Sequence, residues 1–141
     1  HAQSAVLARN ATEVRQNFRE FLDEVLHDRP QAITRYDDVV MALSLQHLEA
    51  LLEHISFTME YEKESDMSVS GSIIELPLCE NAGSVEELKA ILADAMVAYA
   101  GTYLAEFKRC FNSPGLDKQL PYILKIYIQP DLEAVMQLIH G

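Results

Sequence analysis

The sequence predicts an α+β protein, with a β-α-β-β-α module at the N-terminus and a small β-α-β-α domain after it. Three observations support this fold class. Apolar residues recur every three or four positions in some stretches, as in amphipathic helices, and alternate in others, as in strands. A polar, charged stretch separates the two sets of elements. Hydrophobic residues make up 49% of the 141 positions, which is enough to bury a core.

The N-terminal module is expected to span residues 1–57. A short strand is predicted over 4–7, followed by a helix that begins at Glu13 with Thr12 as its N-cap. Apolar side chains at helical spacing define one buried face of this helix, which ends at about His27. The side chains of this face are Val14, Phe18, Phe21, Leu22, Val25 and Leu26.

Two β-rich runs follow the first helix, at 32–36 and at 39–45. Asp37 and Asp38 lie between them, and this spacing predicts a tight antiparallel hairpin. Leucine and isoleucine residues then return to helical spacing, so a second helix is predicted to reach about Phe57.

A linker is predicted over residues 58–72, where charged side chains precede a cluster of Ser and Gly. The C-terminal domain is then expected to cover 73–141. The extended segment that leads into it is predicted over 68–78, and a turn is predicted at 80–83.

A long helix is predicted from Ser84 to about Phe107, with Ser84 and Glu87 forming a capping box at its start. The run 122–128 alternates like a strand, and a closing helix is predicted over 130–139. The C-terminal domain therefore has the predicted order strand, helix, strand, helix.

The formal net charge of −11 argues against broad, non-specific binding of nucleic acid, because affinity for phosphate comes from Lys and Arg. Residues 1–50 hold five arginines against eight acidic residues, a net of −3, so any DNA contact must come from a local patch. Residues 51–141 hold six cationic against fourteen acidic residues, a net of −8. That excess suits a basic partner or simply solubility, and the sequence leaves both interpretations open.

Five short motifs occur in order along the first third of the chain. They are Thr12–Phe18 (TEVRQNF), Phe21–Val25 (FLDEV), Ala32–Arg35 (AITR), Val40–Leu45 (VMALSL) and Leu48–Leu52 (LEALL). In this order and spacing they resemble the Phd/YefM antitoxin family over residues 4–55. The resemblance implies a homodimer or higher oligomer that binds operator DNA with two-fold symmetry and represses a toxin-antitoxin operon.

The resemblance assigns DNA contact to Arg15, in the first turn of the predicted helix, and to Arg35, in the Ile-Thr-Arg motif. A guanidinium can clamp a phosphate or the edge of a guanine, which agrees with this role. Polar and basic neighbours extend the set, although solvated surface is an equally ordinary role for them. The DNA-binding candidates are Arg15, Arg35, Asn17, Arg9, Arg19 and Gln16.

The hairpin loop departs from the family. Members often carry basic or Gly-rich residues after Ile-Thr-Arg, whereas this chain has Tyr36, Asp37 and Asp38. Two carboxylates beside Arg35 would repel phosphate. Arg35 therefore either pairs with one of these carboxylates and is structural, or the affinity for DNA is weakened or lost.

The C-terminal part departs as well, because family members typically end in a short, often disordered tail that folds on the toxin. Residues 67–141 have enough apolar periodicity to fold by themselves. The resemblance implies toxin binding by this part, and an aromatic stripe and exposed acids on its long helix are the candidates, although such a stripe is also typical of a core. The toxin-binding candidates are Tyr99, Tyr103, Phe107, Glu86 and Glu87.

No motif indicates an enzyme, a cofactor or a metal site. A Ser/His/Asp order, a phosphate-binding Gly loop and a His-Glu-x-x-His motif are all missing, and His47 and His54 lack a third ligand. Cys79 and Cys110 are expected to be reduced thiols. No uncharged apolar run approaches the ~20 residues that span a bilayer, and no secretory signal pattern is seen, so a cytoplasmic protein without a membrane partner is expected.

We therefore expect an antitoxin of a type II toxin-antitoxin system. It would neutralise a cognate toxin through the C-terminal domain and bind operator DNA as a homodimer. The alternative is a dimeric protein-interaction module that keeps the antitoxin fold but has lost DNA binding.

Overall fold

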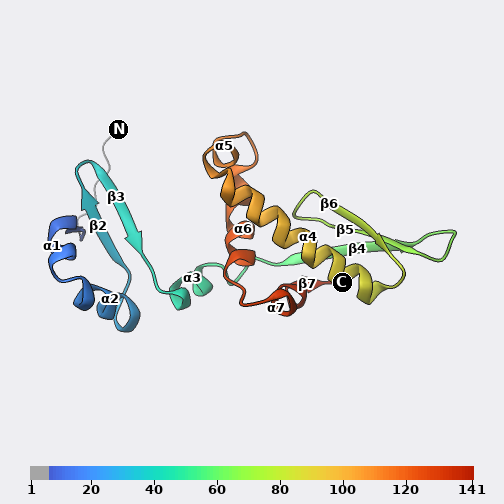
Figure 1. Ribbon diagram of the computed structural model, residues 1–141, viewed down its shortest axis with the longest axis horizontal. Coiled ribbons are helices and arrows are strands. Elements are labelled where there is room, and N and C mark those ends of the chain that lie inside the picture. Colours follow the sequence, from blue (N-terminus) through green and yellow to red (C-terminus); the bar gives the residue numbers. More distant parts are fainter. Residues whose placement is uncertain (1–6) are drawn as a thin grey trace. The chain divides into compact units, whose positions relative to one another are not determined.

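The computed structural model describes residues 7–141, which form a mixed α+β structure with two small sheets and seven α-helices (Figure 1). The chain divides into two compact units, residues 1–53 and residues 54–141. Each unit has its own sheet and its own cluster of buried side chains.

In the first unit, a short strand and two helices precede a hairpin that leads into a third helix. The elements are β1 (Arg9–Asn10), α1 (Ala11–Gln16), α2 (Phe18–His27), β2 (Gln31–Arg35), β3 (Asp38–Ala42) and α3 (Leu45–Leu51). β1 pairs parallel with β2, and β2 pairs antiparallel with β3, with Arg35 opposite Asp38 beside the turn. The hairpin prediction is confirmed, whereas the strand predicted over 4–7 falls largely outside the residues that the structure describes.

The first helix is broken at Asn17, which the sequence analysis did not predict. Asn10, and not Thr12, caps α1, because the Asn10 side chain accepts a hydrogen bond from the Thr12 backbone N–H at 2.8 Å. At Asn17 the backbone leaves the helical region (φ −126°, ψ 45°), and the side-chain amide donates to the Glu13 carbonyl at 3.4 Å. Asn side chains compete in this way with the hydrogen bonds of a helix, and α2 starts again at Phe18.

The last helix of the first unit is shorter than predicted. α3 follows a capping box, in which the Ser44 hydroxyl accepts from the His47 N–H at 3.2 Å and His47 Nδ1 accepts from the Ser44 N–H at 3.1 Å. The helix ends at Leu51 rather than at Phe57. Phe57 is fully buried at the start of a strand in the second unit, so a core position decides its conformation.

The core of the first unit is small. Val14, Phe21 and Val25 are its buried side chains, and Ile33 and Ala42 pack against them. A unit of this length buries little apolar area by itself, so a core of this size stabilises it only marginally. The first unit therefore has more to gain from assembly than the second.

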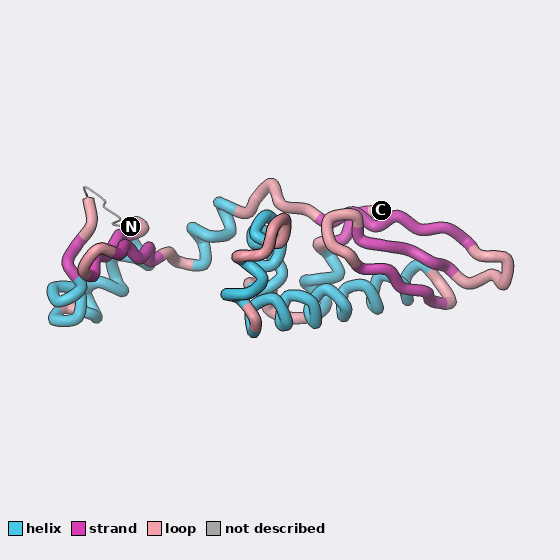
Figure 2. The backbone as a smooth tube through the Cα atoms, turned by 90° about the horizontal axis from the view of Figure 1, so that it is seen from above, coloured by secondary structure: helices cyan, strands magenta, loops and turns pink. Residues whose placement is uncertain are grey.

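The second unit is a sheet with a long helix against one face and shorter helices around that helix. The elements are β4 (Phe57–Lys63), β5 (Val69–Ile73), β6 (Leu78–Ala82), α4 (Val85–Ala105), α5 (Phe107–Phe111), a 3₁₀ turn at 117–119, α6 (Leu120–Tyr127), α7 (Leu132–Gln137) and β7 (Ile139–His140). The strand order is β6-β5-β4-β7, with β7 parallel to β4. Figure 2 shows α4 lying along one face of the strands.

The linker predicted over 58–72 is wrong, because these residues belong to the paired strands β4 and β5. The polar composition has a physical reason. Glu60 lies opposite Ser72 and Glu62 lies opposite Ser70, on the side of the sheet away from α4. An antiparallel sheet can present an entirely polar outer face, and that face has the composition of a linker.

The strand predicted over 122–128 is also wrong, because this run forms the helix α6. Pro121 lies in its first turn, where proline is tolerated, and the buried residues Ile123 and Ile126 are three positions apart. A short, continuously apolar run fits a helix and a strand equally well, and here packing against α4 decides. The predicted β-α-β-α order of the second domain is corrected accordingly.

Smaller corrections concern the segments on either side of α4. The extended segment predicted over 68–78 breaks after Ile73, and the turn predicted at 80–83 lies mostly within β6. The closing helix is the short α7, whose N-cap is Asp131, and the chain then returns to the sheet as β7.

The N-terminus of α4 is set by Ser84, as predicted. The Ser84 hydroxyl accepts from the Glu87 N–H at 3.2 Å, whereas the Glu87 carboxylate accepts from the Gly83 N–H at 3.3 Å instead of from Ser84. By length and mean hydropathy (1.2), α4 is long and apolar enough to cross a membrane. In this structure Leu88 and Met96, on its buried face, have no exposed surface and form the centre of the core.

Gly71 in β5 provides a test of this packing, because a Cβ there would lie 2.7 Å from Leu88 Cδ2 and 2.8 Å from the Glu60 carbonyl oxygen. We expect Gly71→Ala to lower the free energy of unfolding by about 1–3 kcal/mol through overpacking. Gly101→Ala in α4 is the control, because a Cβ there meets nothing within 4 Å. Alanine should raise helix stability by about 1 kcal/mol. Urea unfolding followed by circular dichroism measures both variants, and equal stabilities would contradict this account.

Candidate functional site

A surface hollow of about 430 Å³ lies where the start of α1 meets the turn of the β2–β3 hairpin. Its lining comes from both elements and contains the two arginines that were assigned to DNA. The lining residues are Asn10, Ala11, Thr12, Arg15, Thr34, Arg35 and Tyr36. The fold therefore brings Arg15 and Arg35 together, although 20 positions of sequence separate them.

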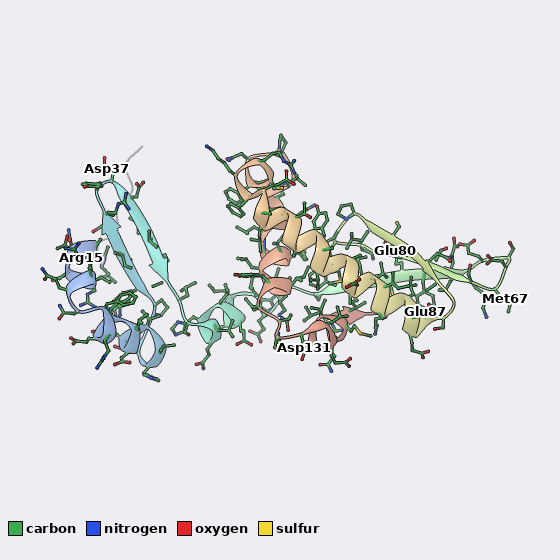
Figure 3. The ribbon with its side chains drawn as sticks, viewed as in Figure 1. Arg15, Asp37, Met67, Glu80, Glu87 and Asp131 are labelled. Atoms are coloured by element: carbon green, nitrogen blue, oxygen red, sulfur yellow. The ribbon has the colours of Figure 1, made fainter. Side chains whose placement is uncertain are left out.

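Each arginine is positioned by its own backbone element. Arg15 is exposed in the last turn of α1, and not in the first turn of a longer helix as predicted (Figure 3). Arg35 ends β2, and its guanidinium carbon lies 5.8 Å from the centroid of the Tyr36 ring, in a cation–π contact. Tyr36 has a left-handed backbone (φ 53°) and is 92% exposed, so it turns the chain at the hairpin tip.

The carboxylates of Asp37 and Asp38 lie near this hollow, but neither forms an ion pair with Arg35. Asp37 lies in the turn (Figure 3), and Asp38 is the partner of Arg35 in the strand register. Within residues 7–141 the ion pairs present do not include Arg35. Of the two alternatives raised by the sequence, pairing of Arg35 with a neighbouring carboxylate is not observed, and both carboxylates remain exposed.

The other DNA-binding candidates lie outside the hollow. Arg9 Nη1 donates to Glu24 Oε2 at 3.1 Å, with the two side chains 27% and 33% exposed, so this ion pair joins β1 to α2. Gln16, Asn17 and Arg19 are exposed but do not line the hollow. Arg9 therefore has a structural partner, and the remaining three are surface residues beside the site.

The helix α2 presents apolar side chains to solvent as well as to the core. Phe21 and Val25 are buried, whereas Phe18, Leu22 and Leu26 are 54%, 42% and 55% exposed. These three lie at four-residue spacing and form a stripe along one side of the helix. The sequence pattern identified all five positions but could not separate the buried residues from the exposed ones, because both follow the same period.

Among the toxin-binding candidates, Tyr103 is corrected, because it is a core residue. It is 2% exposed, and its hydroxyl donates to the Leu116 carbonyl at 2.7 Å, so it offers no surface to a partner. Tyr99 is half-buried and donates to Gln119 Oε1 at 2.6 Å. Phe107 is 37% exposed and packs its edge against Tyr103, with ring centroids 5.9 Å apart.

The acidic candidates lie at the other end of α4. Glu86 and Glu87 are exposed in its first turn (Figure 3 labels Glu87), and the Glu87 carboxylate accepts from the Gly83 N–H. They are accessible to a partner, but they lie most of the helix length away from Phe107. The predicted toxin-binding residues therefore do not form a single cluster.

The described part of the chain, residues 7–141, contains no group of three His, Cys, Asp or Glu side chains placed to hold a metal ion. Cys79, which is exposed, and Cys110, which is buried, are both free thiols.

The comparisons with known proteins identify the family. The sequence model of the PHD-like family, described as antitoxins of RelE/RelB toxin-antitoxin systems, matches residues 6–141. The chain belongs to this antitoxin family. The crystal structure of the antitoxin part of a proposed toxin/antitoxin system from Syntrophomonas wolfei subsp. wolfei is similar, with a TM-score of 0.88 and 32% sequence identity. The similarity covers 94% of this chain and 96% of that one. Among curated protein sequences, none matches the chain.

The family match extends the antitoxin assignment well beyond the first third of the chain. Residues 56–141, which the resemblance to Phd/YefM did not cover, lie within the matched family, and the similarity to the solved structure covers 94% of the chain. Assignment to the Phd/YefM branch in particular stays a prediction. Antitoxin families of this kind are not typical enzymes.

The antitoxin also has a groove that the sequence analysis did not anticipate. It has a volume of about 550 Å³ and lies between α4, α6 and α7 in the second unit. Val97, Tyr127 and Leu132 line it and are 43%, 67% and 42% exposed. The sequence analysis missed this groove because it predicted a strand over 122–128, where the structure has α6, one of the three helices around the groove.

Burial of Tyr103 in the antitoxin generates a prediction about pH. Burial raises the pKa of Tyr103 above its ordinary value of 10.0, because the phenolate would lose its hydration. The folded pKa then exceeds the unfolded one, so the stabilising contribution is complete below about pH 10 and is lost as the pH rises through the folded value. We expect Tyr103 to ionise only together with alkaline unfolding, measured by tyrosinate absorbance and circular dichroism.

Two substitutions separate this effect from the ionisation of exposed tyrosines. Tyr103→Phe should remove the late ionisation and lower the free energy of unfolding at neutral pH by about 1 kcal/mol, because the Leu116 carbonyl loses its donor. Tyr36→Phe, at a position 92% exposed, should leave both unchanged. Loss of the late ionisation in Tyr36→Phe would show that Tyr103 is not the residue concerned.

Proposed function

We propose that this antitoxin neutralises a cognate toxin through residues 54–141 and binds the operator of its own operon as a homodimer. Its family and the similar antitoxin structure support the antitoxin role. The convergence of Arg15 and Arg35 on one surface hollow supports the DNA-binding role. Both partners, DNA and toxin, would be met in the cytoplasm.

The hollow has the chemistry that a DNA backbone requires. Two guanidiniums give charge-assisted, potentially bidentate hydrogen bonds to phosphate oxygens or to a guanine edge. Asn10 and Thr12 add polar side chains at the rim. Because the chain as a whole carries a net charge of −11, this local pair of arginines has to supply the attraction for phosphate.

Dimerisation would both stabilise the first unit and duplicate the hollow. The unit has three buried core side chains, while Phe18, Leu22 and Leu26 of α2 remain exposed. An apolar stripe of this kind, on a unit with so small a core, is typical of an obligate partner surface. β3 lies at the edge of the first sheet, where a second hairpin could add to it. Two copies related by two-fold symmetry would present two hollows to a palindromic operator.

The second unit would provide the surface for the toxin. Residues 54–141 hold six cationic against thirteen acidic residues, a net of −7. A toxin that cleaves RNA needs a basic substrate surface, and an acidic protein complements such a surface. Neutralisation would then follow from covering that surface.

The alternative is a dimeric interaction module without DNA binding, and the hairpin turn favours it. Asp37 and Asp38 are exposed beside Arg35 and would repel a phosphate that approaches the hollow. The two functions differ in one measurable property, which is the affinity for DNA upstream of the antitoxin gene at low salt.

The DNA-binding role is tested with Arg15→Ala and Arg35→Ala. Each should raise the Kd for the upstream DNA about tenfold and lower the slope of log K against log salt by about one, because each removes a phosphate-neutralising cation. Arg29→Ala is the matched control, because Arg29 donates to the Pro30 carbonyl and lies outside the hollow. Mobility shift across a salt series measures all three. If wild-type protein gives no shift at low salt, the interaction module is the correct function.

The dimer is tested by Leu22→Lys, which places a charge within the α2 stripe and should convert a dimer into a monomer because the charge would be desolvated. Asp23→Lys adds the same side chain at the neighbouring exposed position and should leave the dimer intact. Sedimentation equilibrium gives the mass of each variant. A wild-type monomer, or a Leu22→Lys variant that stays dimeric, would refute this interface.

A further inference from the structure

The groove between α4, α6 and α7 has an apolar floor that the protein leaves in contact with water. Val97 lies on α4, Tyr127 at the end of α6 and Leu132 at the start of α7, and all three are more than one-third exposed. Three exposed apolar side chains on three elements around one hollow form a patch, in contrast to scattered single residues. Covering such a patch is favourable because it removes apolar surface from water.

Gly101 gives a second, independent observation at the same place. It lines the groove from the C-terminal part of α4, inside the helix, where glycine is less favourable than alanine. Nothing in the chain requires glycine there, because a Cβ at this position meets no atom within 4 Å. Gly71 is the contrast, since its missing Cβ makes room for Leu88. The open space at Gly101 is therefore available to a group that approaches the helix from outside.

The rim of the groove is acidic. Asp94 on α4 and Asp131 at the N-cap of α7 belong to its lining and are exposed (Figure 3 labels Asp131). One carboxylate oxygen of Asp131 accepts a hydrogen bond from the Ala134 N–H as the N-cap of α7, and Asp94 forms no ion pair among the described residues. No Lys, Arg or His occurs among the described residues that line the groove.

We propose that this groove is the surface on which the second unit binds the toxin. It takes a toxin segment that presents an aliphatic or aromatic side chain, flanked by Lys or Arg, to the apolar floor and the acidic rim. The proposal rests on the toxin-neutralising function above and specifies where the toxin binds.

Charge selects this occupant over a second copy of the antitoxin. A second copy would bring another unit with a net charge of −7 to a rim that is already acidic, which is unfavourable. A second acidic hollow lies on the outer face of the sheet, with Glu60 and Glu62 in its lining. It is less suited to be the centre of an interface, because binding energy concentrates where apolar anchors are buried.

The test uses the full-length antitoxin and, as the probe, the purified product of the gene adjacent to its own. Gly101→Met fills the groove from the floor, and Thr102→Met places the same side chain at the next exposed position of α4, outside the lining. Isothermal titration calorimetry should give a Kd at least about tenfold higher for Gly101→Met and an unchanged Kd for Thr102→Met. Urea unfolding should show that neither variant is less stable than the wild type, because methionine favours helix more than glycine or threonine does.

A second pair of variants tests the acidic rim. Asp94→Lys should weaken binding of the same probe, most strongly at low salt, because it places a cation opposite the basic segment. Glu62→Lys makes the same reversal on the outer face of the sheet and should change the affinity much less. The reverse order of effects would place the toxin on the sheet and overturn the groove proposal.

The remaining outcomes separate this proposal from the proposed function. If the probe binds wild type and Gly101→Met equally well, the groove proposal falls and toxin binding by the antitoxin stands. If Gly101→Met alters only self-association, measured by sedimentation in the absence of the probe, the groove is a contact between copies and the proposal is wrong. If the probe does not bind wild type at all, toxin neutralisation and the groove proposal fall together.

Discussion

The second unit depends on one close contact, between the backbone of β5 and the helix α4. Leu88 occupies the space that a side chain at residue 71 would fill, so α4 can lie directly on the sheet only because that residue is glycine. From this contact follows the position of the whole helix, whose buried face is the centre of the core. The helices α6 and α7 then pack on α4, and β7 returns to β4. The groove between the three helices is a consequence of the same arrangement, because two of its walls are held in place by the third.

The first unit has no comparable contact. Its sheet is a single hairpin with a two-residue strand added, and its core consists of three buried side chains. Three local interactions stabilise the first unit. They are the N-cap at Asn10, the ion pair between Arg9 and Glu24, and the hydrogen bond from the Thr34 hydroxyl to the Arg9 carbonyl. A unit with so small a core has more stability to gain from assembly than the second unit, which accords with the dimer that we propose.

The sequence identified the residues of the candidate DNA site, but it did not show that they converge on one hollow. Arg15 and Arg35 were identified from the motifs TEVRQNF and AITR. The acidic hairpin loop was recognised as a departure from the Phd/YefM family. The convergence of the two arginines needed the parallel pairing of β1 with β2, which sets α1 beside the hairpin. Arg9, a DNA-binding candidate, and Tyr103, a toxin-binding candidate, were both misassigned for the same reason, because each is held by a partner distant in sequence. The groove was missed because its walls come from three segments, one of which was predicted in the wrong class.

The sequence by itself determined the features that depend on residues close together in the chain. Two acidic residues between two β-rich runs indicated the hairpin, although its turn is formed by Tyr36 and Asp37, and Asp38 begins β3. Ser84, three residues before Glu87, specified the start of α4. Tertiary structure decided the conformation of two segments whose overall composition suggested a different one. The acidic segment over 58–72 becomes a strand pair because its alternate side chains face α4 or water, and the apolar run over 122–128 becomes a helix because it packs on α4. Composition alone does not decide the conformation of such segments, since the surface that they meet distinguishes one conformation from the other.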